Sequence, residues 1–268
     1  MVHYLVLPIV AAALLWTTTS SAQSSPGAPV QIEEWSHERV SSLGRRIFLH
    51  DRAAWLATDA LRANVTAEDI AQVRGWIVVE DPAGLLVRFA READGAILPG
   101  WDVSVGESAG PVSPAPAGST FSSSELAQFA ARNTAGRGLG ALRCSRTMNS
   151  VVFEDPDGDG WLVWLLAATT EPGLIPVGGH YRFTISSDGS TIVRRDQLSN
   201  SCLNMRDDRR GPNGERAGLV VNQIVSNGPV ETHVFLSLLN QTPIYVAADG
   251  KLFAVEGDRI RFVQTIED

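Results

Sequence analysis

The chain has 268 residues and a formal net charge of −8 at pH 7. Nucleic acid and anionic lipid bind to basic faces, so this acidic chain argues against both as partners. Hydrophobic residues form 44% of the sequence, which is enough for an ordinary globular core, and the length fits one large domain or two small ones.

Residues 1–22 have the pattern of a cleavable secretory signal peptide. An apolar run of about 12 residues, from Leu5 to Trp16, is long enough for the core of a signal and too short to span a bilayer. The small residues 20–22 (Ser-Ser-Ala) follow, so cleavage would leave Gln23 first. We therefore expect a periplasmic or secreted mature chain. Because no Lys or Arg precedes the run, an uncleaved anchor is the alternative.

The two cysteines, Cys144 and Cys202, both lie downstream of the predicted signal. In an oxidising compartment an even pair most often forms one bridge, so we expect a disulfide between them. Two free buried thiols or a redox pair are the alternatives, although no CxxC spacing indicates reactivity.

The first half of the mature chain reads as a helix, a meander and a second helix. We expect the first helix over residues 32–63, with a possible break at Gly44. Its apolar stripe consists of Leu43, Ile47, Ala54, Trp55, Thr58 and Leu61. A short helix begins at Thr66, and strands follow over residues 76–80, 85–90 and 97–105. Residues 106–119 are rich in Gly, Pro and Ser and resemble a linker, and a helix over residues 122–134 begins with capping-box spacing.

The second half reads mostly as strands joined by Asp-Gly turns. We expect them over residues 151–154, 161–168, 180–186, 191–196, 231–238, 243–247, 252–256 and 259–264, while residues 219–225 are ambiguous. The predicted fold class is α+β: a long N-terminal helix, an antiparallel β meander, a second helix and then a larger antiparallel sheet. We expect residues 23–268 to form a single domain, with a possible division at the linker 106–119.

Residues 106–110 match the G-x-S-x-G elbow of serine hydrolases, with Ser108 as the nucleophile. The elbow requires a helix directly after the serine, whereas Pro111, Pro114 and Pro116 follow here. A flexible linker is therefore the favoured interpretation, and a hydrolase is the alternative.

Two acidic features suggest further sites. Asp155, Asp157 and Asp159 lie in a Gly-containing turn that resembles the start of a calcium loop, but the twelfth position is Leu166 instead of Glu, so a hairpin turn is favoured. Asp51 lies within the apolar stripe of the first helix, where a carboxylate must be paired or protonated if it is buried. We favour a structural Asp51 bonded to a neighbouring element over a functional one.

The best candidate ligand site combines two predicted strands. Alternation places His180 and Arg182 on one face of the first strand, and Glu231 and His233 on one face of the second. If these faces meet, the four side chains could bind an anion or a polar ligand, or do acid–base chemistry. A solvated sheet face with cross-strand pairs is the alternative, and two His without a third ligand are weak evidence for zinc.

Several stretches together resemble a family of uncharacterised exported proteins from alphaproteobacteria. The resemblance implies a periplasmic or secreted location and no activity or catalytic residue. It rests on residues 50–55 (His-Asp-Arg-Ala-Ala-Trp), 58–59 (Thr-Asp), 176–183 (Pro-Val-Gly-Gly-His-Tyr-Arg-Phe), 201–203 (Ser-Cys-Leu) and 231–235 (Glu-Thr-His-Val-Phe).

The sequence therefore favours a non-enzymatic, exported binding module of the cell envelope, with a small ligand or an envelope protein as its partner. A hydrolase of envelope or extracellular substrates is the alternative, and a calcium-stabilised structural protein is a third possibility. No catalytic residue, metal site or cofactor is predicted.

Overall fold

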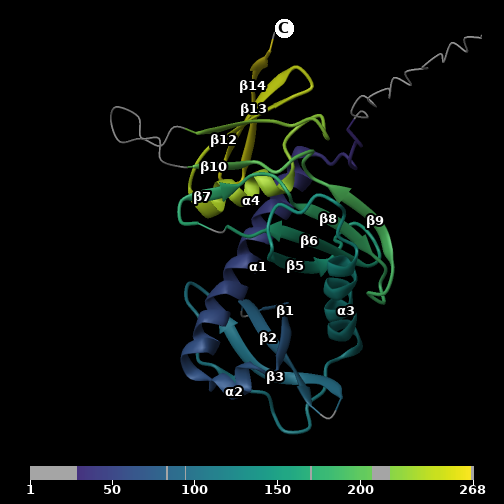
Figure 1. Ribbon diagram of the computed structural model, residues 1–268, viewed down its shortest axis with the longest axis vertical. Coiled ribbons are helices and arrows are strands. Elements are labelled where there is room, and N and C mark those ends of the chain that lie inside the picture. Colours follow the sequence, from purple (N-terminus) through teal and green to yellow (C-terminus); the bar gives the residue numbers. More distant parts are fainter. Residues whose placement is uncertain (1–28, 83, 94, 170, 207–217, 267–268) are drawn as a thin grey trace, which may run out of the picture.

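The computed structural model describes residues 29–266, except 83, 94, 170 and 207–217. The predicted signal peptide lies outside the described residues. Figure 1 shows a long helix, α1, that runs past three sheets. The helices are α1 (His37–Asn64), α2 (Ala67–Ile70), α3 (Ser123–Arg137) and α4 (Glu231–Asn240). The observed fold is α+β, as predicted.

The fourteen strands of the described residues form three four-stranded sheets and one pair. The first sheet contains β1 (Val73–Asp81), β2 (Gly84–Ala93), β3 (Ala96–Val105) and β4 (Ser113–Pro114) in that order. The second contains β5 (Met148–Glu154), β6 (Trp161–Ala167), β8 (Tyr181–Ile185) and β9 (Ile192–Gln197). The third contains β11 (Leu219–Asn222), β12 (Ile244–Ala248), β13 (Lys251–Glu256) and β14 (Arg259–Thr265). The short strands β7 (Leu174–Pro176) and β10 (Asn204–Arg206) form the pair.

Helix α1 begins later than predicted and is not broken at Gly44. Ser36 is its N-cap, because the Ser36 side chain accepts a hydrogen bond from the Arg39 backbone N–H at 3.2 Å. The prediction that Trp55 belongs to the buried stripe is wrong, since Trp55 is 60% exposed. The stripe itself is real: Leu43 and Ile47 are buried in the core.

The glycine at position 44 allows α1 and α4 to pack closely, and it does not interrupt α1. A Cβ at this position would lie 2.5 Å from Val234 Cβ and 2.6 Å from the Glu231 carbonyl oxygen, both on α4. These distances are shorter than any ordinary van der Waals contact, so α1 and α4 can approach this closely only because residue 44 has no side chain. The close approach outweighs the conformational cost of a glycine inside a helix.

The first sheet confirms the predicted meander, and the second half of α1 covers one of its faces. Ala57 and Leu61 of α1 pack against Val87 and Val103. The predicted linker does not leave this sheet. Its segment Ser113–Pro114 forms β4, which pairs with β3, so the proline-rich stretch extends the sheet by a short edge strand, a position that proline tolerates.

Helix α3 is confirmed together with its capping box at Ser122 and Glu125. It covers one face of the second sheet, where Ala131 and Ala135 are fully buried. It also joins two sheets. The Gln128 side-chain N–H₂ donates to the carbonyl oxygens of Val78 and Val152, each at 3.0 Å, and thereby connects edge strand β1 of the first sheet to edge strand β5 of the second.

The prediction of a strand over residues 231–238 is wrong, because this segment is helix α4. All residues from Glu231 to Ser237 are buried, so no one-sided hydrophobic period marks the helix. Its N-cap is Val230, which has no side-chain oxygen, so the usual start signal is also missing. As a consequence, β11 and β12 are parallel, joined by a crossover that contains α4.

The predicted disulfide is confirmed. Cys144 and Cys202 lie at disulfide distance, with their sulfur atoms 2.10 Å apart and their Cα atoms 5.3 Å apart. Cys144 lies between α3 and the second sheet, and Cys202 lies between β9 and β10. The bond therefore ties the loop that enters the second sheet to the segment that leaves it.

Candidate functional site

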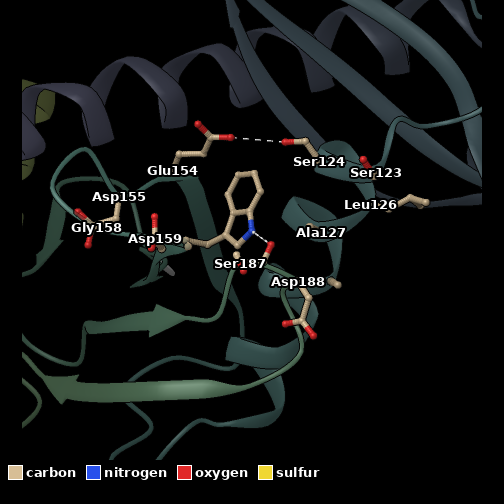
Figure 2. Close-up of a pocket in the computed structure, with 13 residues that line it drawn as sticks. Ser123, Ser124, Leu126, Ala127, Glu154, Asp155, Gly158, Asp159, Ser187 and Asp188 are labelled. Carbon is tan, nitrogen blue, oxygen red and sulfur yellow. Dashed lines mark hydrogen bonds between the residues drawn. The ribbon is translucent and has the colours of Figure 1, made fainter.

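An open cavity of about 940 Å³ lies against α3 at one end of the second sheet. Two turns form its rim, residues 155–160 between β5 and β6 and residues 186–190 between β8 and β9 (Figure 2). It is lined by Ser123, Ser124, Leu126, Ala127, Ala130, Glu154, Asp155, Gly158, Asp159, Gly160, Trp161, Ser187 and Asp188. Both turns contain Asp and Gly next to a strand end, which explains why polar side chains gather here.

Trp161 gives this cavity a rigid wall. Its indole Nε1–H donates to the Ser187 carbonyl oxygen at 3.0 Å, and the side chain is almost completely buried. The bond joins the first residue of β6 to the turn after β8. The two turns on the rim are thereby held in a fixed relation to each other.

Three carboxylates of the cavity, those of Glu154, Asp159 and Asp188, take part in no ion pair among the described residues. Figure 2 shows that they come from the end of β5 and from the two rim turns. Hydrogen bonds from Ser186 and Ser190 lower the pKa of Asp188 to about 2, so this group is charged at neutral pH. The cavity therefore carries uncompensated negative charge.

The calcium-loop interpretation of the 155–160 turn is not supported. The Arg39 guanidinium bridges Asp155 at 3.0 Å and Asp157 at 2.6 Å, so two of the three carboxylates of the turn are neutralised by a cation of the chain itself. Within the described part of the chain, no cluster of three or more His, Cys, Asp or Glu side chains has the arrangement of a metal site. A hairpin turn, the favoured interpretation, is what the structure contains.

A second cavity of about 560 Å³ adjoins the first and shares Ser124, Glu154 and Trp161 with it. It extends toward α1 and the edge of β1, where it reaches His50 and Glu80. We call the two cavities together the α3 groove. Nothing in the sequence indicated this groove, because its walls come from elements that are distant along the chain: α1, the edge strands β1 and β5, and α3.

His50 and Glu80 form a fixed pair at the α1 end of the α3 groove. Glu80 Oε1 lies 2.7 Å from His50 Nε2 and 2.6 Å from Arg46 Nε. The hydrogen bond from His50, with that from Arg46, lowers the pKa of Glu80 to about 2, while burial lowers the pKa of His50. An ionised carboxylate only accepts hydrogen bonds, so His50 Nε2 carries the proton and Nδ1 is left with a lone pair. Among the described residues, buried Nδ1 has no hydrogen-bond partner.

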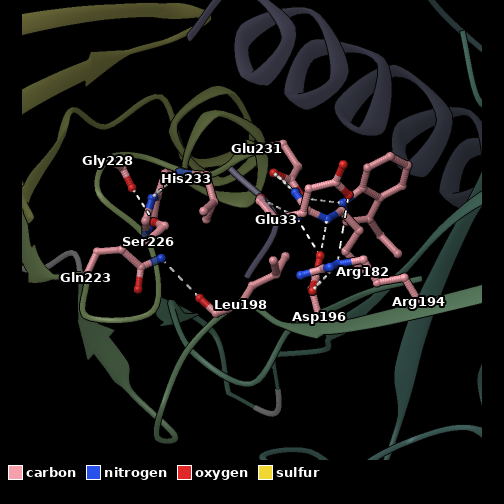
Figure 3. Close-up of polar contacts among 12 residues, drawn as sticks. Glu33, Arg182, Arg194, Asp196, Leu198, Gln223, Ser226, Gly228, Glu231 and His233 are labelled. Atoms are coloured by element: carbon pink, nitrogen blue, oxygen red, sulfur yellow. Dashed lines mark hydrogen bonds and ion pairs between the residues drawn. The ribbon is translucent and has the colours of Figure 1, made fainter. Parts of the chain in front are cut away.

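The predicted ligand site lies in the interior, and its two charged members meet there (Figure 3). Arg182, only 2% exposed, contacts Asp196 at 2.7 Å and Glu231 at 3.3 Å. Its guanidinium carbon lies 3.6 Å from the ring centroid of Trp35. Glu231 is completely buried and also accepts a hydrogen bond from Trp164 Nε1 at 2.8 Å. These side chains form a satisfied ionic network between β8, β9 and α4.

The two histidines of that predicted site are bonded to the backbone. His180 accepts from the Ala167 N–H at 3.0 Å through Nδ1, and its Nε2 lies 2.8 Å from the Pro176 carbonyl oxygen. His233 accepts from the Val230 N–H at 3.1 Å through Nδ1. Burial lowers the pKa of His180 to about 4 and that of His233 to about 3, so both are neutral at neutral pH. The ligand-binding role of these four residues stays a prediction, and it would require the core to open.

Ser108 is exposed in the turn that follows β3. The turn is closed by a hydrogen bond from the Gly106 N–H to the Ser108 carbonyl oxygen at 3.1 Å, and the next regular element is strand β4. Among the described residues, no hydrogen bond joins the Ser108 hydroxyl to a histidine. The helix and the base that activate a serine at a nucleophile elbow are therefore not found around Ser108.

Asp51 is bonded to a neighbouring element, as the favoured interpretation predicted: Asn149 Nδ2 on β5 lies 3.4 Å from Asp51 Oδ1. Burial raises the pKa of this carboxyl to about 6 from the ordinary aspartate value of 3.8. Folding therefore takes up a proton between these two pH values. The cost of an ionised Asp51 is absent at low pH and is felt fully once the pH has risen above about 6.

Asp51→Asn is accordingly expected to stabilise the protein at pH 7.5 by roughly 1–2 kcal/mol, a value reduced for the partial exposure of the side chain. The gain should shrink as the pH falls from 6 toward 3.8 and disappear well below pH 3.8, where the carboxyl is protonated in both states. Urea unfolding at several pH values measures this directly, with Asp59→Asn on the exposed side of α1 as the control. An equal stability difference at pH 4 and pH 7.5 would contradict the raised pKa.

Comparisons of the chain with protein-family models, with curated proteins and with solved structures find no match. Within the described part of the chain, no helix combines the length and the apolar character that crossing a membrane requires.

Proposed function

We propose that this protein is an exported, non-enzymatic binding module of the cell envelope, and that its α3 groove takes a positively charged partner. The observation that carries the proposal is the open cavity of about 940 Å³ in which Glu154, Asp159 and Asp188 have no cationic partner among the described residues. A second observation is His50, whose buried Nδ1 lone pair is unpartnered at the far end of the groove.

The location rests on independent support. A disulfide between Cys144 and Cys202 fits an oxidising compartment, and the apolar run of residues 5–16 fits a signal peptide. The resemblance to exported proteins of alphaproteobacteria points to the same compartment. A periplasmic or secreted location therefore agrees with the disulfide between the two cysteines.

The charge of the α3 groove indicates the chemistry of the partner. Ammonium and guanidinium groups offer only donors, and carboxylates offer only acceptors, so lysine or arginine side chains match this surface. Each exposed ion pair contributes about 0.2–1 kcal/mol, so three carboxylates give a modest affinity that falls as salt is added. An extended basic peptide segment would meet the carboxylates of both rim turns together.

A trilysine peptide is a suitable probe, and isothermal titration calorimetry at low ionic strength measures its binding to the mature protein. We expect saturable binding that weakens with added sodium chloride. The triple variant Glu154→Gln, Asp159→Asn, Asp188→Asn should reduce the affinity at least about tenfold, which corresponds to the loss of roughly 1.4 kcal/mol.

A matched control is the triple variant Asp59→Asn, Glu68→Gln, Glu107→Gln, which removes the same charge from exposed positions outside the groove. Binding by this control should equal that of the unchanged protein. Equal losses in both triple variants would mean that only the net charge attracts the peptide, and this result, like an absence of binding, would refute the proposal.

The alternative function, a hydrolase of envelope or extracellular substrates, is favoured by one observation: the carboxylate–imidazole pair of Glu80 and His50 has a fixed tautomer in which Nδ1 could accept a proton. A fluorophosphonate probe tests it, because only an activated serine is labelled. Labelling that is lost in a folded His50→Gln variant would favour the hydrolase, whereas loss in Ser108→Ala would identify the serine of the elbow motif.

A further inference from the structure

Arg132 on α3 lies at the junction between the first two sheets, at the end opposite the pair of His50 and Glu80. Two contacts hold its side chain in a fixed position. Its Nε–H donates to Ser150 Oγ on β5 at 2.7 Å. Its guanidinium carbon lies 4.3 Å from the ring centroid of Trp76 on β1. The side chain therefore bridges two edge strands through one hydrogen bond and one aromatic contact.

The backbone of β1 makes room for this guanidinium. Gly75 has a φ of +144° at a bulge in the pairing of β1 with β2. A Cβ added at Gly75 would overlap Arg132 Nη1. Residue 75 must therefore lack a side chain for Arg132 to lie where it does, and its φ value is one that other residues rarely adopt.

Arg132 differs from the other arginines that are withdrawn from solvent. Arg182 contacts Asp196 and Glu231, and Arg88 contacts Asp102 and Glu125. Arg132 enters no ion pair with any residue that the structure describes, and burial lowers its pKa with no carboxylate to oppose the effect. A guanidinium cannot lose its proton under ordinary conditions, so the chain retains a partly desolvated cation without a counterion.

The free donors of Arg132 remain reachable. Its only hydrogen bond within the described structure uses Nε, so Nη1 and Nη2 have no acceptor from the protein. Neither atom is among the unpartnered polar atoms that are enclosed, which are Trp35 Nε1, Arg39 Nε and His50 Nδ1. Each Nη group therefore keeps some solvent-accessible surface, and the two form a fork whose position is set by Ser150 and Trp76, with Nη1 in the space that a Cβ of residue 75 would fill.

We propose that Arg132 binds the oxyanion group of a small ligand through this free fork, in a site built by Ser150, Trp76 and Gly75. Two parallel N–H groups match two oxygens of a carboxylate or a phosphate, and a fixed guanidinium loses less side-chain freedom on binding than a mobile one. The site is separate from the α3 groove and has the opposite charge preference.

NMR can observe the proposed contact at the residue itself. The Arg132 Nε–H signal is identified by its disappearance in Arg132→Lys, and sodium acetate and sodium phosphate are titrated against sodium chloride at constant ionic strength. We expect this signal to shift along a saturable curve with a millimolar Kd. Saturation with acetate alone identifies a carboxylate ligand, and saturation with phosphate alone identifies a phosphate ligand.

Two variants and one control complete the test. Arg132→Lys keeps the charge and lacks the fork, so the amide shifts of Gly75 and Trp76 should then require at least about fivefold more anion. Ser150→Ala leaves the guanidinium present and releases Nε, and should also weaken binding. Arg62→Gln, an exposed arginine at the end of α1, should change nothing. Shifts that are linear with both anions, or unaffected by Arg132→Lys, would overturn the proposal.

Discussion

Glu231→Ala is expected to lower the free energy of unfolding by about 3–5 kcal/mol. The substitution leaves Arg182 buried with only one of its two carboxylates, and it removes the acceptor of the Trp164 indole N–H. Both groups would then be polar, buried and incompletely paired, which is the costliest kind of loss in a protein core. Urea unfolding at pH 7, followed by circular dichroism, measures the difference.

The control for this prediction is Glu92→Ala, which breaks an ion pair with Arg74 whose two side chains are 47% and 44% exposed. Solvent screens that pair, so the expected loss is below about 1 kcal/mol. If Glu231→Ala costs as little as Glu92→Ala, the interior network around Arg182 does not contribute to stability as argued.

Replacing both cysteines, Cys144→Ser with Cys202→Ser, is expected to cost about 4 kcal/mol of unfolding free energy. The bond closes a loop with a sequence separation of 58 residues, and removing it returns that loop's conformational entropy to the unfolded chain. Thermal or urea unfolding under oxidising conditions measures the loss.

The reductant provides the control for the disulfide prediction. Dithiothreitol should destabilise the unchanged protein by a similar amount and leave the double variant unaffected, because only the former has a bond to reduce. A double variant as stable as the oxidised protein would contradict the prediction, and it would also weaken the argument that the chain is built for an oxidising compartment.

Much of the fold could be predicted because its signals are local. The capping box at Ser122 and Glu125 involves residues three positions apart, and the meander of the first sheet is marked by turn residues between short apolar runs. Helix α4 carries neither kind of signal. Its residues Glu231 to Ser237 are all buried and its N-cap, Val230, has no side-chain oxygen, so the sequence pattern resembles that of an interior strand.

The candidate sites were much less predictable than the fold. Strand alternation grouped Arg182 with Glu231, but it does not apply to Glu231, which lies on helix α4. The two side chains meet in the interior, where α4 and Trp35 bury them. The turn 155–160 resembles a calcium loop in sequence. Its carboxylate Asp155 is instead neutralised by Arg39, which lies 116 positions away along the chain.

The sequence by itself determined the α+β class, the capped α3, the meander and the pairing of Cys144 with Cys202, because these depend on neighbouring residues or on there being only two cysteines. Only the tertiary structure decided which polar side chains are enclosed and which remain free. The groove of Glu154 and Asp188 and the open fork of Arg132 arise where distant elements meet. Whether a side chain is buried and whether its charge is paired depend on tertiary packing, since its partners are set by the chain segments that pack around it.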